Sequence, residues 1–319
     1  MDHVPVLVEE VLRYLAPERG GLYVDTTVGL GGHAEALLEA SESARVLGID
    51  RDPRALERAG RRLARFGGRV RLVEGSFSEI RELLARAEPA VARPAGILAD
   101  LGVSSLQLDT PERGFSFRFD APLDMRMGSS GPTAGEIVNR YPEADLTRIF
   151  REYGEERQAR RIARALATAR TEAPIETTRR LREVILGAKG LEPAGARREG
   201  RVDPATRVFQ ALRIEVNREL AELERFVDEA ARLLAIDGRV VVISYHSLED
   251  RIVKHSLRDL ARGEIDEVTG RPRAESRILE VLTKKPVRPS PAEIAANPRA
   301  RSARLRAAVR RGTGRTVEP

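Results

Sequence analysis

The chain has 319 residues, a length that allows one large domain or two, with an ample apolar core. It contains no cysteine, which excludes disulfides, thiolate metal ligands and a cysteine nucleophile, and its four histidines lack metal-ligand spacing, so no metal site is predicted. The sequence has neither a signal-peptide pattern nor a run of about 18 apolar residues, and we expect a cytoplasmic protein. The net charge is +6, which favours an acidic partner.

Helices and strands alternate over the first third of the chain. The strands are short and rich in Val, Ile and Leu, and each is followed by a helical pattern. This alternation is typical of a parallel, doubly wound α/β sheet, in which ligands bind beyond the carboxyl ends of the strands. The predicted strands are 22–26, 45–50, 70–74 and 95–100, and the predicted helices are 7–15, 32–42, 53–65 and 78–86.

The regular alternation stops after residue 100. The next buried strand, 239–244, lies much further along the chain than the roughly 30 residues that a βαβ unit needs. We therefore predict an inserted helical domain for substrate recognition at 108–205, within a cofactor-binding domain formed by 1–107 and 206–319. The helices expected in this part of the chain are 143–153, 155–170, 178–186 and one long crossover helix over 204–234, and Thr133-Ala-Gly-Glu136 resembles a capping box.

A glycine-rich turn follows the first predicted strand. The segment Tyr23-Val-Asp-Thr-Thr-Val-Gly-Leu-Gly-Gly-His33 reads as a strand, a turn and the start of a helix. Gly29, Gly31 and Gly32 let the backbone turn tightly and approach a ligand closely. The second strand ends in Asp50, about 20 residues beyond the glycines, where a carboxylate usually accepts from ribose hydroxyls. The sequence therefore predicts a site for a nucleotide-type cofactor.

The glycine spacing alone fits two cofactors, because it also satisfies the dinucleotide pattern G-x-G-x-x-G/A. Three acids end predicted strands: Asp25, Asp50 and Asp100. They would repel a pyrophosphate but suit S-adenosylmethionine, which carries a sulfonium and an ammonium group. A single acid of this kind often only caps a helix, as Asp52 is expected to do. The three together favour S-adenosylmethionine over a dinucleotide.

Other side chains fall at the same predicted edge of the sheet. Phe77 follows the third strand, where it could stack on an adenine ring or anchor the next helix in the core. Tyr245 and His246 follow the fifth strand and are expected to emerge near Asp100, where they could face the substrate. Ser247 is predicted to be a helix cap, because it adjoins His246 and no nucleophile elbow is present.

Basic residues concentrate at the C-terminal end of the chain. Ten lysines and arginines lie between Lys284 and Arg315, against one acid, Glu293. Such a segment is suited to binding phosphate backbones, although it is also typical of a solvated face in an arginine-rich chain. We expect the phosphate contacts to come from Arg301, Arg304 and Arg306, with a second basic face on the inserted helices at Arg157, Arg160, Arg161 and Arg164.

Several blocks of the sequence are long and unusual. They are Val24-Asp-Thr-Thr-Val-Gly-Leu-Gly-Gly-His33, Leu98-Ala-Asp-Leu-Gly-Val-Ser-Ser-Leu-Gln-Leu-Asp109, Pro122-Leu-Asp-Met-Arg-Met127, Phe209-Gln-Ala-Leu-Arg-Ile-Glu-Val-Asn217, His246-Ser-Leu-Glu-Asp-Arg251 and Asn297-Pro-Arg-Ala-Arg-Ser-Ala303. In these blocks the sequence resembles the ribosomal RNA small subunit methyltransferase H family. The resemblance runs from His3 to about Arg306, nearly the whole chain.

The resemblance implies a class I methyltransferase fold, which is a Rossmann-like doubly wound seven-stranded sheet, with an inserted helical domain. It also implies that S-adenosylmethionine provides a methyl group for the N4 exocyclic amine of a cytidine in the decoding region of bacterial 16S rRNA. The substrate would then be the small ribosomal subunit. In the family, the cofactor is held by residues that correspond here to Gly31, Gly32, His33, Asp50, Phe77, Asp100 and Gln107.

The N4 amine is a poor nucleophile because its lone pair is delocalised into the ring, so an acceptor must hydrogen-bond its hydrogens. Many amino-methyltransferases carry Asp/Asn-Pro-Pro-aromatic at the fourth strand, whereas this chain has Asp100-Leu-Gly-Val-Ser104 and lacks that aromatic. We expect Asp100, or a carbonyl beside it, to accept from N4. Tyr245, His246 or an aromatic within 115–119 is then expected to clamp the base.

Three other functions fit parts of the pattern. An N4-cytosine DNA methyltransferase would use the same chemistry, and only the family blocks favour RNA. A non-catalytic RNA-binding assembly factor would retain the crevice as a remnant, and a dinucleotide-dependent dehydrogenase would fit the glycine spacing. The sequence does not indicate the oligomeric state.

Overall fold

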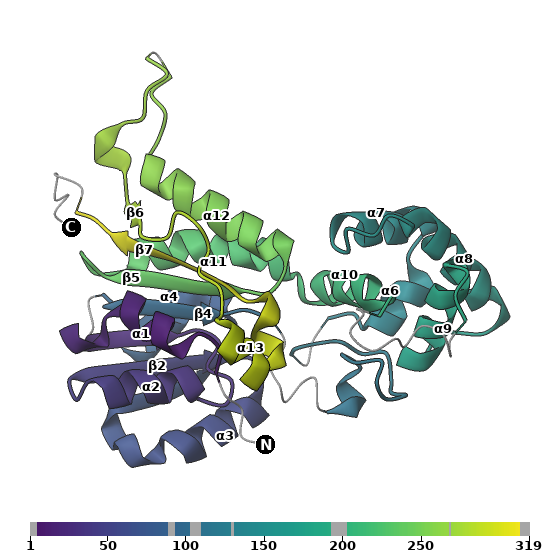
Figure 1. The fold of residues 1–319 in the computed structure, drawn as a ribbon, viewed down its shortest axis with the longest axis horizontal. Helices are drawn as coiled ribbons and strands as arrows, with labels where there is room; N and C mark the ends of the chain where they lie inside the picture. The colour runs from purple at the N-terminus through teal and green to yellow at the C-terminus, as the bar shows by residue number, and fades with distance from the viewer. Residues whose placement is uncertain are drawn as a thin grey trace. The chain divides into compact units, whose positions relative to one another are not determined.

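The computed structural model describes residues 5–88, 93–102, 110–128, 131–192, 203–267 and 269–312. The chain forms two compact units, one made of Met1–Gly102 with Leu220–Pro319 and the other of Val103–Glu219 (Figure 1). Residues 206–219 therefore belong to the second unit, whereas the sequence-based division assigned them to the cofactor-binding domain. Among the described residues, no helix is long and apolar enough to cross a bilayer.

The first unit is built on a seven-stranded sheet with the strand order β3-β2-β1-β4-β5-β7-β6. The strands are β1 (Gly21–Asp25), β2 (Ala44–Asp50), β3 (Val70–Glu74), β4 (Gly96–Asp100), β5 (Arg239–Ser244), β6 (Leu279–Val281) and β7 (Arg304–Arg310). The first five pair in parallel, whereas β7 runs antiparallel to both β5 and β6. The predicted doubly wound seven-stranded sheet is confirmed, and its last two strands are antiparallel.

Helices cover both faces of this sheet (Figure 1). One face is covered by α1 (Val8–Leu15), α2 (Gly32–Ala40) and α3 (Pro53–Leu63), and the other by α4 (Ile80–Ala87), α11 (Glu219–Leu233) and α12 (Ser247–Arg262). Side chains alternate between the two layers, so Val241 and Ile243 of β5 join the first, and Val240 and Val242 join the second. This explains why the parallel strands are almost continuous apolar runs.

The carboxyl ends of β2, β1 and β4 meet at one edge, because these strands are neighbours in the sheet. Their last residues are Asp50, Asp25 and Asp100. The register extends the same edge into the antiparallel part, since Asp100 lies beside Ile243 of β5 and Ile243 lies beside Leu305 of β7. The three acids predicted to lie together thus occupy the edge where doubly wound sheets bind ligands.

The second unit is helical and has its own apolar core. Its helices are α6 (Ala134–Arg140), α7 (Glu143–Glu152), α8 (Ala159–Glu172), α9 (Thr178–Ala188) and α10 (Thr206–Asn217). Phe150 of α7 and Leu212 of α10 are fully buried in this core. The predicted capping box is confirmed, because Thr133 Oγ1 accepts from the Glu136 N–H and the Glu136 carboxylate accepts from the Thr133 N–H.

The single long helix predicted over 204–234 is wrong. The chain is interrupted at Arg218, which takes a left-handed conformation with φ 51° between α10 and α11. The buried side chain of Asn217 explains the interruption. Its amide donates to the Met125 carbonyl and accepts from the Met127 N–H, both at 2.8 Å. These bonds offset the roughly 1–2 kcal/mol that a left-handed non-glycine residue costs.

Candidate active site

The turn after β1 depends on its glycines for two different reasons. Gly29 has φ 51° and Gly31 has φ 81°, so any side chain at either position would be strained. At Gly32 the constraint is packing, because a Cβ atom there would lie 2.9 Å from the ring of Pro5. Gly31 is also the N-cap of α2, and the turn therefore presents the positive end of that helix at the sheet edge.

Asp50, at the end of β2, fixes the turn from the neighbouring strand. Its Oδ2 accepts from the Gly29 N–H and its Oδ1 accepts from the Asp52 N–H, both at 2.9 Å. Burial raises the pKa of Asp50, although these backbone hydrogen bonds oppose the rise. Because a carboxylate has about four acceptor sites, Asp50 can still accept from a ligand hydroxyl. Asp52 caps α3 as predicted, since its Oδ1 accepts from the Arg54 N–H.

Asp25, at the end of β1, is the most deeply buried of the three acids, with 1% of its surface exposed. Its Oδ1 accepts from the Thr27 N–H at 3.2 Å, whereas its Oδ2 is buried without a hydrogen-bond partner among the described residues. Burial raises the pKa of Asp25 to about 7, and the nearby charge of His33 opposes that rise. An unsatisfied buried carboxylate is costly, so this position favours a cationic or hydrogen-donating ligand.

Asp100, at the end of β4, is held from two sides. The Tyr245 hydroxyl donates to its Oδ1 at 2.8 Å, and its own N–H donates to Thr27 Oγ1 at 2.6 Å. Burial raises the pKa of Asp100 to about 7, while the Tyr245 hydrogen bond lowers it and the charge of Glu249 raises it. The expectation that Tyr245 emerges beside Asp100 is confirmed.

His33 lies between two of these acids and the N-terminal segment. Its Nε2 is 2.8 Å from the Val6 carbonyl, and since a carbonyl only accepts, this nitrogen carries the ring proton. Its Nδ1 is 3.9 Å from Asp100 Oδ2. Burial lowers the pKa of His33, against the opposing charge of Asp25. His33 therefore links the N-terminal segment to the acids at the sheet edge.

The segment around Val6 is a part of the site that the sequence analysis missed. Pro5 packs on Gly32, and Leu7 is buried with a left-handed φ of 55°. The Leu7 N–H donates to Glu293 Oε1 at 2.7 Å, a contact between residues 286 positions apart. A contact this distant in the chain leaves no local pattern in the sequence, and only the apolar character of the segment hinted that it is buried.

Phe77 fills one of the two roles that the sequence left open, that of a core residue. Its ring packs edge-on against Phe226 of α11, with ring centroids 5.4 Å apart, so it contributes to the core. The guanidinium of Arg51 lies 5.4 Å from the same ring and also pairs with Glu222. The ring is only partly buried, and stacking on an adenine remains a prediction. Gln107, the other side chain predicted from the resemblance, lies outside the described residues.

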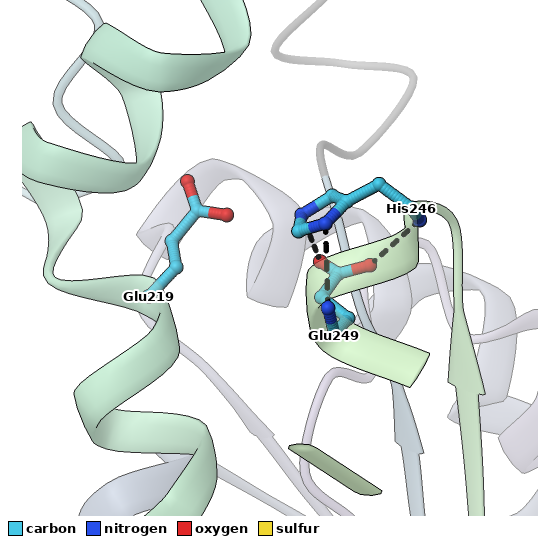
Figure 2. Close-up of side chains that lie close together, drawn as sticks. All are labelled: Glu219, His246 and Glu249. Carbon is cyan, nitrogen blue, oxygen red and sulfur yellow. Dashed lines mark hydrogen bonds and ion pairs between the residues drawn. The ribbon is translucent and has the colours of Figure 1, made fainter. Parts of the chain in front are cut away.

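The residues after β5 differ in part from the prediction. His246, not Ser247, is the N-cap of α12, and Ser247 is the first residue of the helix. Figure 2 shows how the Glu249 carboxylate accepts from the His246 N–H at 3.2 Å. The imidazole Nε2 of His246 lies 3.1 Å from the other Glu249 oxygen. His246 is thus tied into a capping box, which the sequence missed because histidine is an uncommon cap.

Two of the predicted base-clamping aromatics are core residues of the second unit. Phe115 is buried, and the ring of Phe117 packs edge-on against Phe209 with the ring centroids 5.0 Å apart. Phe119, by contrast, is 51% exposed. On or beside α8, Arg157, Arg160 and Arg161 are exposed as expected. Arg164 also lies on that helix, with its Nε 3.8 Å from Glu143.

The C-terminal arginines are used differently from the prediction. Arg306 is only 7% exposed, and its Nε donates to Asp250 Oδ1 at 2.6 Å. Arg304 also lies 3.7 Å from that carboxylate. Alternate residues of β7 point to the same face, and here they point towards α12. The expectation that Arg306 contacts phosphates is therefore wrong, because its charge is already paired inside the fold.

This fold and site define a class of protein. A parallel sheet that ends in an antiparallel pair, with a glycine turn after β1 and acids ending β1, β2 and β4, is a class I S-adenosylmethionine-dependent methyltransferase. A model of the MraW methylase family matches residues 1–311, and the chain belongs to that family.

Individual relatives agree with this assignment. The chain is 53% identical over 316 residues to a ribosomal RNA small subunit methyltransferase H from Geobacter sulfurreducens, covering 96% of this chain and 98% of the relative. It is 48% identical over 310 residues to the protein of that name from Granulibacter bethesdensis, covering 96% and 90%. The Thermobifida fusca protein of that name is 51% identical over 313 residues, covering 97% and 93%. The resemblance is confirmed, and S-adenosylmethionine, not a dinucleotide, is the cofactor.

Proposed function

We propose that this chain methylates the N4 exocyclic amine of a cytidine, at rRNA position 1402, in the 16S rRNA of the small ribosomal subunit. Family membership supplies the reaction class, and the names of the relatives supply the small-subunit rRNA. The observation that carries the proposal is the group of acids at one sheet edge, Asp25, Asp50 and Asp100. Among the described residues, none of the three forms an ion pair with a lysine or arginine.

The residues at this edge fit S-adenosylmethionine. The unpartnered Oδ2 of Asp25 suits a cationic group, and the free lone pairs of Asp50 suit ribose hydroxyls. The N-terminal end of α2 suits a carboxylate. When bound, the cofactor supplies a methyl group attached to an electron-poor sulfur. We assign cofactor binding to Gly31, Gly32, His33, Asp50, Phe77, Asp100 and Gln107.

Asp100 is the residue that we assign to the reaction itself. Bound cofactor would supply the methyl carbon to N4 and keep the electron pair of the broken bond on sulfur, and one N4 proton would have to be removed. A carboxylate that accepts a hydrogen bond from N4–H localises the nitrogen lone pair and then takes the proton. A pKa of about 7 suits Asp100 to this role near neutral pH.

Tyr245 positions that carboxylate. Its hydroxyl donates to Asp100 Oδ1, which leaves Oδ2 for the amine. The ring of Tyr245 lies against Gly102, where an added Cβ would be 3.2 Å from it. The side chain is therefore confined at both its ring and its hydroxyl. We assign Tyr245 to holding Asp100, not to stacking on the base, because its hydroxyl is already committed.

The RNA must present the target cytidine unpaired or flipped out, because its N4 atom is otherwise engaged in pairing. We assign RNA recognition to the helical second unit, where the exposed Arg157, Arg160 and Arg161 can reach a phosphate backbone. A ribosomal substrate places the reaction in the cytoplasm.

Methyl transfer from labelled S-adenosylmethionine to small subunits isolated from a strain that lacks this protein tests the proposal. Digestion to nucleosides should show the label as N4-methylcytidine. Label in a different nucleoside would overturn the N4 assignment, and label in DNA but not in subunits would favour the DNA-modifying alternative. Cofactor binding without any transfer would support a non-catalytic assembly factor.

A further inference from the structure

We propose that Lys284, Lys285, Arg288 and Arg301 form a phosphate-binding surface for the RNA strand that carries the target base. We call these four residues the basic strip. This inference rests on the proposed function, since it names how the first unit holds the same substrate. It also replaces the expectation that Arg306 provides the phosphate contact.

The strip begins on a protrusion from the edge of the sheet. Leu282 donates to the Ala307 carbonyl, and further along Val287 pairs with Leu305. From Leu282 to Val287 the outer segment advances by five residues, whereas β7 advances by two, from Ala307 to Leu305. The extra residues of the outer segment therefore bulge outward. Thr283 anchors the bulge, because it is buried and its Oγ1 accepts from the Ala307 N–H at 2.9 Å. The exposed Lys284 and Lys285 follow this anchor directly.

The other end of the strip reaches the edge that carries Asp100. Asp100, Ile243, Leu305 and Val287 lie side by side on four neighbouring chain segments. Three spacings between adjacent strands place Val287 about 14 Å from Asp100. Arg288, which is exposed, is the next residue. The strip thus extends from the catalytic edge outward, within reach of nucleotides that flank the target.

Arg301 is close in the chain to the end of β7 that lies at this edge. It lies in the 3-10 turn Pro298–Ser302, immediately before the strand, and is exposed. The first residue of β7, Arg304, pairs with Ser244 at the carboxyl end of β5. The same edge therefore receives basic side chains from the segments on both sides of α13 (Pro291–Ala296).

Glu280, an acid near the strip, is paired elsewhere, with Arg311. Glu293 accepts from the Leu7 N–H and keeps its negative charge, but the four positive charges of the strip outnumber it. Asp250 pairs with the two arginines of β7 described above. In the described ranges, no hydrogen bond or ion pair involves the side chains of the strip. Exposed, uncompensated positive charge next to a nucleic-acid-modifying site is the arrangement that phosphate binding requires.

Lysines on an edge strand also have a simpler use, which is to discourage pairing with another sheet. The two roles predict different results. Edge protection predicts that neutral variants aggregate, without a change in how RNA affinity depends on salt. Phosphate binding predicts that each lost contact reduces the salt dependence, because fewer counterions are released.

The test compares two triple variants of the full chain. The strip variant is K284Q/K285Q/R288Q. The control, R58Q/R61Q/R86Q, removes the same charge from exposed positions on α3 and α4, which pack near the opposite end of the sheet. Binding to unmodified small subunits, and to protein-free 16S rRNA, is measured from about 50 to 200 mM salt. Cofactor affinity is measured in parallel.

For the strip variant, we expect the slope of log affinity against log salt to fall by about 2, with affinity about tenfold weaker near 0.15 M salt. Cofactor affinity should be unchanged, and the control should match the wild type. If the slope and the binding to subunits were both unchanged, the strip would not bind phosphates. The proposed function would still be supported by methylation with the wild type. A reduced slope with intact subunits but not with protein-free rRNA would assign the surface to a ribosomal protein and overturn RNA binding.

Discussion

Carboxylates at two places in the first unit are treated in opposite ways. Asp250 lies against Arg306, with an Nε–Oδ1 distance of 2.6 Å, and its charge is compensated within the protein. Asp25 and Asp100 have no lysine or arginine partner in the described ranges, and burial raises the pKa of each to about 7. Buried charges are normally paired, so a group left unpaired indicates a place kept for a ligand.

The second unit follows the paired pattern. Glu156 is buried, and the Lys189 ammonium lies 2.7 Å from its carboxylate. Burial acts to raise the pKa of Glu156, but the hydrogen bonds from Lys189 and the Gln158 N–H, together with the charges of Lys189 and Arg207, outweigh it, and the pKa is lowered. Burial alone therefore does not mark a functional acid in this chain. A functional acid is distinguished by burial without a basic partner, and this combination occurs at the carboxyl ends of β1 and β4.

The largest expected effect comes from removing charge in the unpaired group. Asp100→Asn keeps an oxygen that can accept from Tyr245 but cannot take a proton from N4. We expect kcat for methylation of unmodified subunits to fall about 100-fold or more. Single-turnover transfer, with cofactor affinity measured separately, checks this. Full turnover with normal cofactor binding would show that the carboxylate charge is unnecessary.

Breaking the paired group should affect folding and not chemistry. Arg306→Leu leaves Asp250 with only the more distant Arg304, and should lower the free energy of unfolding by about 2 kcal/mol. Urea denaturation measures the loss. Arg311→Gln is a matched control, because it removes an exposed pair with Glu280, which should contribute less than about 1 kcal/mol. If Arg306→Leu instead left stability unchanged and reduced the salt dependence of RNA affinity, pairing with Asp250 would not be the main role of Arg306.

The contribution of Asp25 to stability should depend on pH. Because the pKa of Asp25 is raised in the fold, its contribution to stability is present near pH 4 and is lost as pH rises to about 7. Asp25→Asn should therefore stabilise the cofactor-free protein at pH 8 by ~1–2 kcal/mol, with little effect at pH 4. Denaturation at both pH values tests this. Asp250→Asn should destabilise at pH 8, and equal destabilisation by both changes would remove the contrast between the groups.

Much of this contrast was visible in the sequence. The short apolar strands and the glycines fixed where each strand ends, and parallel neighbours bring Asp25, Asp50 and Asp100 together whatever the details of packing. The helix break at Arg218 was not predictable from periodicity. It depends on Asn217 finding backbone partners about 90 residues earlier, which no local pattern shows.

The basic segment shows the opposite case. The number of basic residues predicted a phosphate-binding tail. That number does not show which of the basic residues lie on a strand that is covered by a helix. Arg306 faces α12 and pairs with Asp250, whereas Lys284 lies on a bulge and is exposed. Both belong to the same stretch of positive charge. Only the strand register separates the arginine that stabilises the fold from the lysine that is free for a ligand.

Tyr245→Phe tests whether Tyr245 sets the pKa of Asp100 as well as its position. The hydroxyl stabilises the ionised carboxylate, so its loss should raise the pKa of Asp100, which burial and the charge of Glu249 already raise. We expect the acidic limb of the kcat–pH profile to move up by about one unit, with a rate about tenfold lower near neutral pH and largely recovered at high pH. A uniform loss at every pH would mean that the tyrosine is only structural.

The smallest expected effect concerns the N-terminal segment around Val6. This segment packs against the sheet edge that we assign to the cofactor, but it provides none of the acids there. Glu293 holds the Leu7 N–H, and Leu7 keeps a strained φ of 55° only while such contacts define it. Glu293→Ala should cost about 1 kcal/mol of stability and weaken cofactor binding several-fold, because Val6 orients His33. Glu293→Gln retains an accepting oxygen and should behave almost as the wild type. Calorimetric titration of the cofactor into both variants distinguishes the cases: equal weakening would implicate the charge of Glu293, whereas weakening in the alanine variant alone would show that the site depends on this one hydrogen bond.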